Sequence, residues 1–159
     1  MWSLRPAEPD DAAAIAAIWH AGWADGHLGH VPGELVAHRQ ADHFARLAEG
    51  RIAHTTVATS SADVIGFVTV VGDEVEQVYV AAAARGSGVA AALLAHAESV
   101  VAERADVVWL AVVAGNARAR RFYERCGWHD AGSITYLAEI DGGRFEVPCR
   151  RYERRVRAV

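Results

Sequence analysis

The amino-acid sequence predicts an α+β domain with a mixed, mainly antiparallel central sheet and helices on both faces. Three strand-like segments follow one another through short turns rich in Ser, Asp and Gly, which is typical of antiparallel neighbours. A later strand, 107–113, is almost wholly apolar, as expected for a strand covered on both faces. Segments with helical spacing precede and separate these strands. The predicted order is β-α-α-β-β-β-α-β-α-β-β, within a single domain over residues 1–159.

The first half of the chain predicts a strand, two helices and three strands. Residues 3–7 can form the first strand. Pro9, Asp10 and Asp11 then start a helix, because Asp accepts hydrogen bonds from the free N–H groups of a first turn. The stretch "GHLGHVPGE" ends that helix, and the pattern predicts a second, unbroken helix over 34–49. The three strands are predicted at 52–59, 64–71 and 74–80.

The second half alternates helices with strands and ends in a hairpin. Apolar positions predict a helix over 89–103, and the apolar strand 107–113 follows. A short helix is expected over 116–126, with Gly127 ending it. The last two strands are predicted near 133–140 and 145–152, with "DGG" as the turn between them.

Composition narrows the possible functions. The 159 residues are 52% hydrophobic and 23% charged, with a net charge of −4, which argues against a general nucleic-acid binder. The apolar runs are too short to cross a membrane, and the N-terminal residues lack a secretory pattern, so a cytoplasmic protein without membrane association is expected. All 16 basic residues are arginine, which excludes a Schiff-base lysine and a phosphate-loop lysine. Cys126 and Cys149 are interpreted as small buried hydrophobes.

The stretch "VYVAAAARGSGVAAALL" indicates an anion site where a strand passes into a helix. The first N–H groups of a helix have no partner within it and attract anions, and glycine lets the backbone approach a phosphate closely. Arg85 adds a charge at the rim or braces the loop. The donors expected to face one ligand are those of Gly86, Ser87, Gly88, Val89 and Ala90.

Two other readings of this stretch remain open. "GSGVAA" fits the dinucleotide pattern G-x-G-x-x-A, but that pattern should directly follow the first strand of a parallel βαβ unit. Here "AAAAR" separates the strand from the first glycine, and the preceding strands are predicted to be antiparallel. The second alternative is a tight connection with no ligand.

The whole segment resembles the acetyl-CoA-binding motif of the GNAT-type N-acetyltransferase superfamily. Arg85, Gly88 and Ala90 occupy the three fixed places of Gln/Arg-x-x-Gly-x-Gly/Ala. A second segment, "NARARRFYERCGW", resembles the Asn-x-x-Ala-x-x-Phe-Tyr-x-x-x-Gly-Phe motif of that family, with Trp128 in the final aromatic place. The predicted order of elements also matches the GNAT-like fold.

The resemblance implies transfer of an acetyl group from acetyl-CoA to a primary amine by direct attack in a ternary complex. In that family the pantetheine arm lies where two parallel strands splay apart, here the strands ending at Val80 and Val113, so backbone groups of Val78 and Val80 would pair with it. Tyr123 occupies the place of the general acid that protonates the departing thiolate. Glu76 is predicted to share a strand face with Val78 and Val80 and to act as the general base through water; a solvated strand-end charge is the alternative.

Further contacts follow from the same resemblance. Asn116 is expected to cap its helix, to bond the pantetheine arm, or both, and Arg120 is the arginine expected to meet the 3′-phosphate. The connection after the first helix contributes to the acceptor pocket in that family, which makes Trp23, Asp25, His27 and His30 candidate substrate contacts. His27-x-x-His30 lacks the companion ligands of a metal site, so no metal is expected.

Two function classes remain at this stage. The first is a catalytic acetyltransferase acting on a small-molecule amine or a peptide amine. The second is a non-catalytic acyl-CoA-binding regulatory module that kept the cofactor site. A homodimer is plausible by resemblance to the family, in which many members pair through the sheet.

Overall fold

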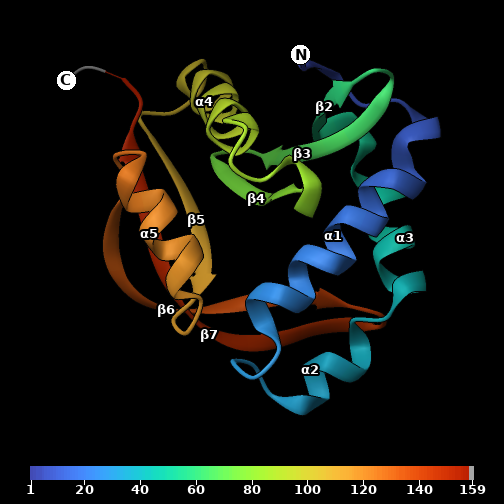
Figure 1. The fold of residues 1–159 in the computed structure, drawn as a ribbon. Coiled ribbons are helices and arrows are strands. Elements are labelled where there is room, and N and C mark those ends of the chain that lie inside the picture. Colours follow the sequence, from blue (N-terminus) through green and yellow to red (C-terminus); the bar gives the residue numbers. More distant parts are fainter. Residues whose placement is uncertain (158–159) are drawn as a thin grey trace.

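In the described residues, 1–157 of the computed structural model, seven strands form one sheet in the order β1-β2-β3-β4-β5-β7-β6 (Figure 1). Neighbouring strands are antiparallel except β4 and β5, which are parallel. The strands are β1 Ser3–Pro6, β2 Thr55–Ser60, β3 Asp63–Val71, β4 Glu74–Val80, β5 Val107–Val113, β6 His129–Ile140 and β7 Gly143–Arg155. The predicted mixed, mainly antiparallel sheet is therefore confirmed.

Helices cover both faces of this sheet, as predicted. The α-helices are α1 Ala12–His27, α2 Gly33–His38, α3 Ala41–Arg51, α4 Val89–Ala102 and α5 Ala117–Arg125. Short 3-10 turns lie at Pro9–Asp11, Ile52–His54 and Ala82–Ala84. Figure 1 shows α1 and α3 side by side, with α4 and α5 on the other side of the sheet.

The single helix predicted over 34–49 is wrong, because the chain breaks between α2 and α3. Gln40 takes an extended backbone conformation, and its side-chain amide donates to the carbonyl of Val36 at 3.0 Å. The backbone N–H of His43 donates to the carbonyl of Gln40, which begins α3. A polar residue that satisfies both helix ends makes the break favourable, and apolar spacing alone does not reveal it.

Other boundaries differ by a few residues. The strands 74–80 and 107–113 lie as predicted. Residues 52–54 form a 3-10 turn, so β2 starts at Thr55. The final hairpin is longer than predicted, because β6 starts at His129 and β7 ends at Arg155. Pairing between β6 and the arginine-rich β7 extends both strands into polar segments, which an apolar pattern does not report.

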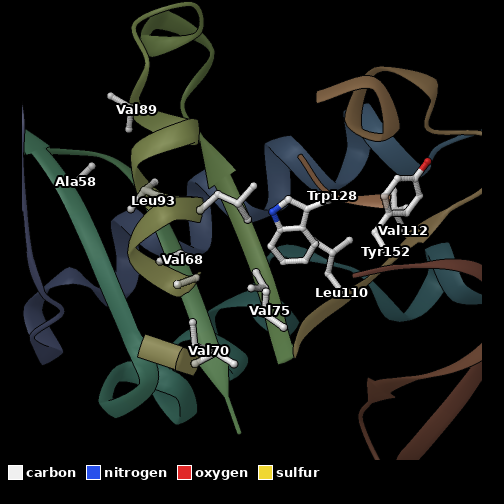
Figure 2. Close-up of a cluster of buried hydrophobic side chains, with 14 residues drawn as sticks. Ala58, Val68, Val70, Val75, Val89, Leu93, Leu110, Val112, Trp128 and Tyr152 are labelled. Atoms are coloured by element: carbon white, nitrogen blue, oxygen red, sulfur yellow. The ribbon is translucent and has the colours of Figure 1, made fainter. Parts of the chain in front are cut away.

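Two hydrophobic clusters lie on the two faces of the sheet. The α4 face joins Leu93 and Leu94 of α4 to Val68 and Val75 of the sheet, and Trp128 extends it toward α5 (Figure 2). On the α1 face, fully buried Phe44 and Phe67 lie within 5.9 Å of Trp19, measured between ring centroids. Burying a large apolar side chain stabilises a fold by roughly 1.5–3 kcal/mol, so these clusters fix the helices that carry the site.

Candidate functional site

The parallel strands β4 and β5 separate after a single point of contact. They pair at Glu74 and Trp109, where the Trp109 N–H donates to the carbonyl of Asp73 at 3.1 Å. Beyond this point the two strands diverge (Figure 1), while β5 stays paired with β7 along its whole length. The backbone groups of β4 that face β5 are thus open to an extended ligand.

A cavity of about 740 Å³ occupies this opening. Its walls come from α1, the α2–α3 junction, β4, the start of α4, β5, α5 and the C-terminal hairpin. The site residues predicted from the sequence that line it are Trp23, Asp25, His27, Glu76, Val78, Val80, Arg85, Gly86, Gly88, Val89, Ala90, Asn116 and Tyr123. The structure therefore brings together most of the predicted site.

The N-terminus of α4 forms one end of the cavity. The first helical hydrogen bond runs from the N–H of Ala92 to the carbonyl of Gly88 at 3.1 Å. Within residues 1–157 the N–H groups of residues 88–91 have no backbone partner, so they are available to an anion. Gly88 caps the helix with φ of 87°, a left-handed conformation that favours glycine. A Cβ at Gly86 or Gly88 would meet no atom within 4 Å, so there is open space beside both glycines.

Ser87 does not join this set of donors. Its N–H donates to the carbonyl of Ala84 at 3.3 Å, and its hydroxyl donates to the same oxygen. Ser87 also does not line the cavity. The prediction that the Ser87 N–H points at the ligand is therefore wrong, because the tight turn before α4 uses this group to close itself.

Arg85 braces the loop against α1. Its Nη2 donates to the Oδ2 of Asp25 at 2.6 Å, and both side chains are partly exposed. Of the two roles predicted for Arg85, bracing is the one this contact displays. Asp25, predicted as a substrate contact, lines the cavity while holding this ion pair.

Tyr123 projects from α5 into the cavity. Its ring lies 6.2 Å from that of Trp128 and 6.0 Å from that of Tyr152, measured between centroids, so packing fixes its orientation. Burial raises the pKa of the phenol well above its ordinary value, so the group stays protonated at neutral pH. Among the described residues, no hydrogen bond occupies the hydroxyl. A protonated, unengaged phenol is suited to donate a proton.

Glu76 lies on the face of β4 opposite to the predicted one. Gln77 pairs with Thr69 and Val75 pairs with Val70, so Glu76 is the extra residue of a β-bulge. The bulge reverses the side-chain alternation, and the carboxylate of Glu76 accepts from the Nε of Arg51, on α3, at 2.7 Å. Val78 and Val80 instead pack on the α4 face. The predicted shared face is thus wrong, although Glu76 still lines the cavity.

Asn116 lines the cavity, whereas Arg120 does not. The Oδ1 of Asn116 accepts from the N–H of Ala119 at 3.2 Å, which caps α5, and its side chain lines the cavity. Arg120 lies away from the cavity, where Nε donates to the Tyr152 hydroxyl at 3.1 Å and Nη2 donates to Asp130 at 3.2 Å. This arginine is engaged in holding α5 to the hairpin, which argues against the predicted phosphate contact.

The two histidines of the predicted pocket separate. His27 stacks on Trp23 with 4.8 Å between ring centroids, and its Nδ1–H donates to the carbonyl of Trp23 at 2.9 Å. Burial lowers the pKa of His27 to about 4, so the ring is neutral at pH 7. His30 lines a second, smaller cavity near the end of β5, where its ring packs directly on Gly115. His30 is therefore not brought to the main cavity.

Sequence reasoning missed several residues in the part of the cavity formed by α1, the α2–α3 junction, β4 and the C-terminal hairpin, here named the acceptor side. Tyr79, on β4, packs so closely on α1 that a Cβ at Gly22 would lie 2.3 Å from its ring. The hydroxyl of Tyr136 donates to Glu74 at 2.5 Å, and burial raises the pKa of that carboxyl. Strand alternation could have indicated Tyr79. Arg39, in contrast, carried no sequence signal, because its place depends on the unpredicted break between α2 and α3.

A profile of the acetyltransferase (GNAT) family matches residues 15–128. The chain belongs to this family. The matched range contains the splayed strands, the start of α4 and all of α5, whereas the part of the cavity wall from the C-terminal hairpin lies outside it. A comparison with curated protein sequences gives no match.

Solved structures of other acetyltransferases have the same fold. A GCN5-related N-acetyltransferase from Rhodopseudomonas palustris is 24% identical, with a TM-score of 0.73 over 96% of this chain and 94% of that one. The putative acetyltransferase yncA from Salmonella typhimurium, solved with acetyl-CoA, is 18% identical, with a TM-score of 0.71 over 100% and 96%. The PaiA N-acetyltransferase from Thermoplasma acidophilum, solved with coenzyme A, is 14% identical, with a TM-score of 0.71 over 98% and 99%. At these identities the likeness supports the fold. Among the described residues, none of the helices has the length and apolar character needed to span a membrane.

Proposed function

We propose that residues 1–159 form one N-acetyltransferase domain that transfers the acetyl group of acetyl-CoA directly to a primary amine bound in the same cavity. The observation that carries this proposal is one continuous cavity that joins the free N–H groups of α4 to the opening between β4 and β5. The acetyl-CoA and coenzyme A complexes of two structural relatives support the choice of cosubstrate.

The residues at the α4 end fit a diphosphate. Four successive N–H groups, 88–91, are unpaired within the described residues, and the open space beside Gly86 and Gly88 leaves room for phosphate oxygens. Backbone groups of Val78 and Val80 on the open side of β4 would hold the amides of the pantetheine arm, and Asn116 would contact the arm while capping α5. Among the four N–H groups, those of Val89 and Ala90 belong to the first turn of α4 and would donate to the diphosphate.

Acetyl-CoA supplies a thioester whose carbonyl carbon is attacked by the amine. The backbone N–H of Val78 would donate to the carbonyl oxygen as it gains negative charge. Tyr123 would donate its proton to the departing sulfur. The new C–N bond replaces the C–S bond, and the proton lost by the amine balances the proton gained by the thiol once Tyr123 is reprotonated.

Glu76 is the proposed base that takes this proton from the amine through water. The β-bulge directs its carboxylate to the α1 side of the cavity, where Glu74 also lies. Arg51 holds the Glu76 carboxylate in place at 2.7 Å. Glu74 instead accepts a hydrogen bond from Tyr136, and it sits where β4 and β5 still pair, farther from the open part of the strand pair.

The test is thiol release from acetyl-CoA across a panel of primary amines, with mass spectrometry of the products. A product heavier than the amine by one acetyl group is expected for at least one acceptor. Binding of acetyl-CoA without turnover of any amine would favour the regulatory module instead. A rise in melting temperature with NAD but not with CoA would identify a dinucleotide site and overturn the proposal.

A further inference from the structure

Arg39 is a buried arginine at the acceptor side of the cavity. It lies between α2 and α3, is 9% exposed and lines the cavity. Its Nη1 donates to the carbonyl of Glu139 at 2.7 Å and to the Nε2 of His43. Among the described residues its Nε is the one buried side-chain nitrogen or oxygen without a hydrogen-bond partner, and Nη2 has none either. Nε is enclosed by protein atoms, whereas Nη2 is not, so Nη2 is the free donor of this guanidinium.

No carboxylate forms a direct ion pair with Arg39 within the described residues, although Glu139 and Asp141 act on its charge from a longer distance. Within residues 1–157, no carboxylate oxygen lies within 4.0 Å of this guanidinium. The two nearby acidic residues form ion pairs with other arginines: Glu139 pairs with Arg51 at 2.7 Å, and Asp141 pairs with Arg46. Burial lowers the pKa of Arg39, which reflects the cost of holding the charge there. Buried charges are normally paired, so an unpaired one at a cavity wall points to an anionic ligand.

The rest of the acceptor side indicates the kind of molecule that carries the anion. Trp19, Trp23 and Leu35 form an apolar wall, and Glu74 and Glu76 place two carboxylates in the same cavity. A ligand that satisfies both parts has a cationic amine and an anionic group joined through a short apolar portion.

The available space limits the size of this molecule. Arg39, Tyr79 and Tyr123 line the same cavity, which has a volume of about 740 Å³. Because the pantetheine arm of acetyl-CoA would share this volume, the space left for the acceptor suits a molecule of amino-acid size, in which a few bonds join the amine to the carboxylate.

We propose that Arg39 binds the carboxylate of a free α-amino acid and so selects this class of acceptor for the N-acetylation described above, on which this inference rests. Nη2 is unpaired and, unlike Nε, is not enclosed by protein atoms, so it can donate to a carboxylate in the cavity, and the charge of the guanidinium strengthens this bond. The N-terminal residue of a protein carries an amide in place of this carboxylate. A peptide amine would leave Arg39 unpaired and is excluded by the same contact.

The experiment compares L-α-amino acids with their carboxamides, which keep the amine and side chain but lose the charge. Binding is measured by the fluorescence of the tryptophans, of which Trp19 and Trp23 line the cavity, and turnover by thiol release from acetyl-CoA. The variants are Arg39→Gln, Arg39→Lys and, as a control, Arg144→Gln, which removes an exposed arginine from the C-terminal hairpin. Calorimetry with acetyl-CoA and circular dichroism report whether each variant keeps the cofactor site and the fold.

At least one acid of the panel is expected to bind the wild-type protein and to react roughly 10- to 100-fold better than its carboxamide, the range for a hydrogen-bonded charge pair. Arg39→Gln should remove this preference, Arg39→Lys should restore part of it, and Arg144→Gln should keep it. Equal use of acid and carboxamide by the wild type would overturn the proposal, as would failure of every acid to bind by fluorescence, even if acetyl-CoA binds. Failure of acetyl-CoA to bind would instead overturn the proposed function, and acid binding to the protein alone would still decide the role of Arg39.

Discussion

The two ends of the cavity are built by different means. The α4 end uses backbone N–H groups and glycine conformations within one short stretch of chain, 85–91. The acceptor end uses side chains from α1, the α2–α3 junction, β4 and the C-terminal hairpin. A backbone site recognises a group shared by every coenzyme A molecule, whereas a side-chain site can change with single substitutions. Under the proposed function, cosubstrate binding depends on the backbone of the fold, and acceptor choice depends on a few side chains such as Arg39.

Tyr123 lines the same cavity, and its substitution is expected to have the largest effect. Tyr123→Phe removes the proposed proton donor and should lower kcat by roughly 100-fold or more, with little change in acetyl-CoA affinity. Since burial raises the pKa of this phenol, wild-type activity should show no loss from its ionisation up to about pH 10.

The control for Tyr123 is Tyr152→Phe. The Tyr152 hydroxyl is held by Glu124 and Arg120 outside the cavity. This variant should cost about 1 kcal/mol of stability and leave kcat nearly unchanged. Steady-state kinetics with saturating acetyl-CoA distinguish the two, and an unaltered kcat for Tyr123→Phe would remove this residue from the chemistry.

The α4 end should fail when a side chain enters the space for phosphate. Gly88→Val places methyl groups beside the free N–H groups and should weaken acetyl-CoA binding by roughly 30-fold or more, measured by calorimetry. Gly142→Val is the matched control, because Gly142 has a nearly identical φ of 84°, and a Cβ there also meets no atom within 4 Å, but it lies in the β6–β7 turn. Equal affinity losses in both variants would mean that backbone strain, and not phosphate exclusion, explains the result.

The acceptor end should lose stability in acid through His27. Its pKa is about 4 in the folded protein and near 6.5 in an unfolded chain, so the unfolded state binds more protons between these values. Stability contributed by the neutral ring is present above pH 6.5 and lost as the pH falls, by about 2 kcal/mol at pH 5.

Urea unfolding at pH 7.5 and pH 5.0 measures this loss. His27→Gln should show a smaller decrease than the wild type, while substitution of the exposed His129 by Gln should leave the decrease unchanged. A pH dependence of His27→Gln equal to that of the wild type would show that His27 is protonated freely in the folded protein.

The ion pair between Arg85 and Asp25 connects the two ends and should have the smallest effect. Both side chains are more than a third exposed, and such pairs stabilise by about 0–1 kcal/mol. Arg85→Gln and Asp25→Asn are each expected to weaken acetyl-CoA binding only a few-fold, and the double variant should resemble either single one. Additive losses in this double-mutant cycle would mean that the two residues act independently.

The same contrast explains what the sequence alone could predict. Gly88 and the donors of α4 follow from local chain chemistry, so the α4 end was predictable apart from Ser87, whose turn closes on Ala84. The side of the sheet to which Glu76 points was not predictable. One extra residue in β4 reverses the alternation of side chains between the two faces, and the apolar pattern of the strand does not change.

Arg39 and Arg120 show a second limit. The position of each side chain depends on partners from segments distant in the sequence. Arg39 donates to the carbonyl of Glu139, and Arg120 donates to Tyr152 and Asp130. The central sheet was predictable because its buried strands have an apolar composition that the sequence shows directly. The long polar hairpin was underestimated, since pairing between β6 and β7 extends it.

The central claim is that the unpaired N–H groups at the start of α4 bind the diphosphate of the cosubstrate. Calorimetric titration of the wild-type protein with acetyl-CoA and with S-acetylpantetheine, which carries the same thioester but no phosphate, tests it most directly. The account predicts that acetyl-CoA binds at least about 30-fold more tightly, a difference of about 2 kcal/mol. Equal affinity for the two compounds, or no detectable binding of acetyl-CoA, would contradict it.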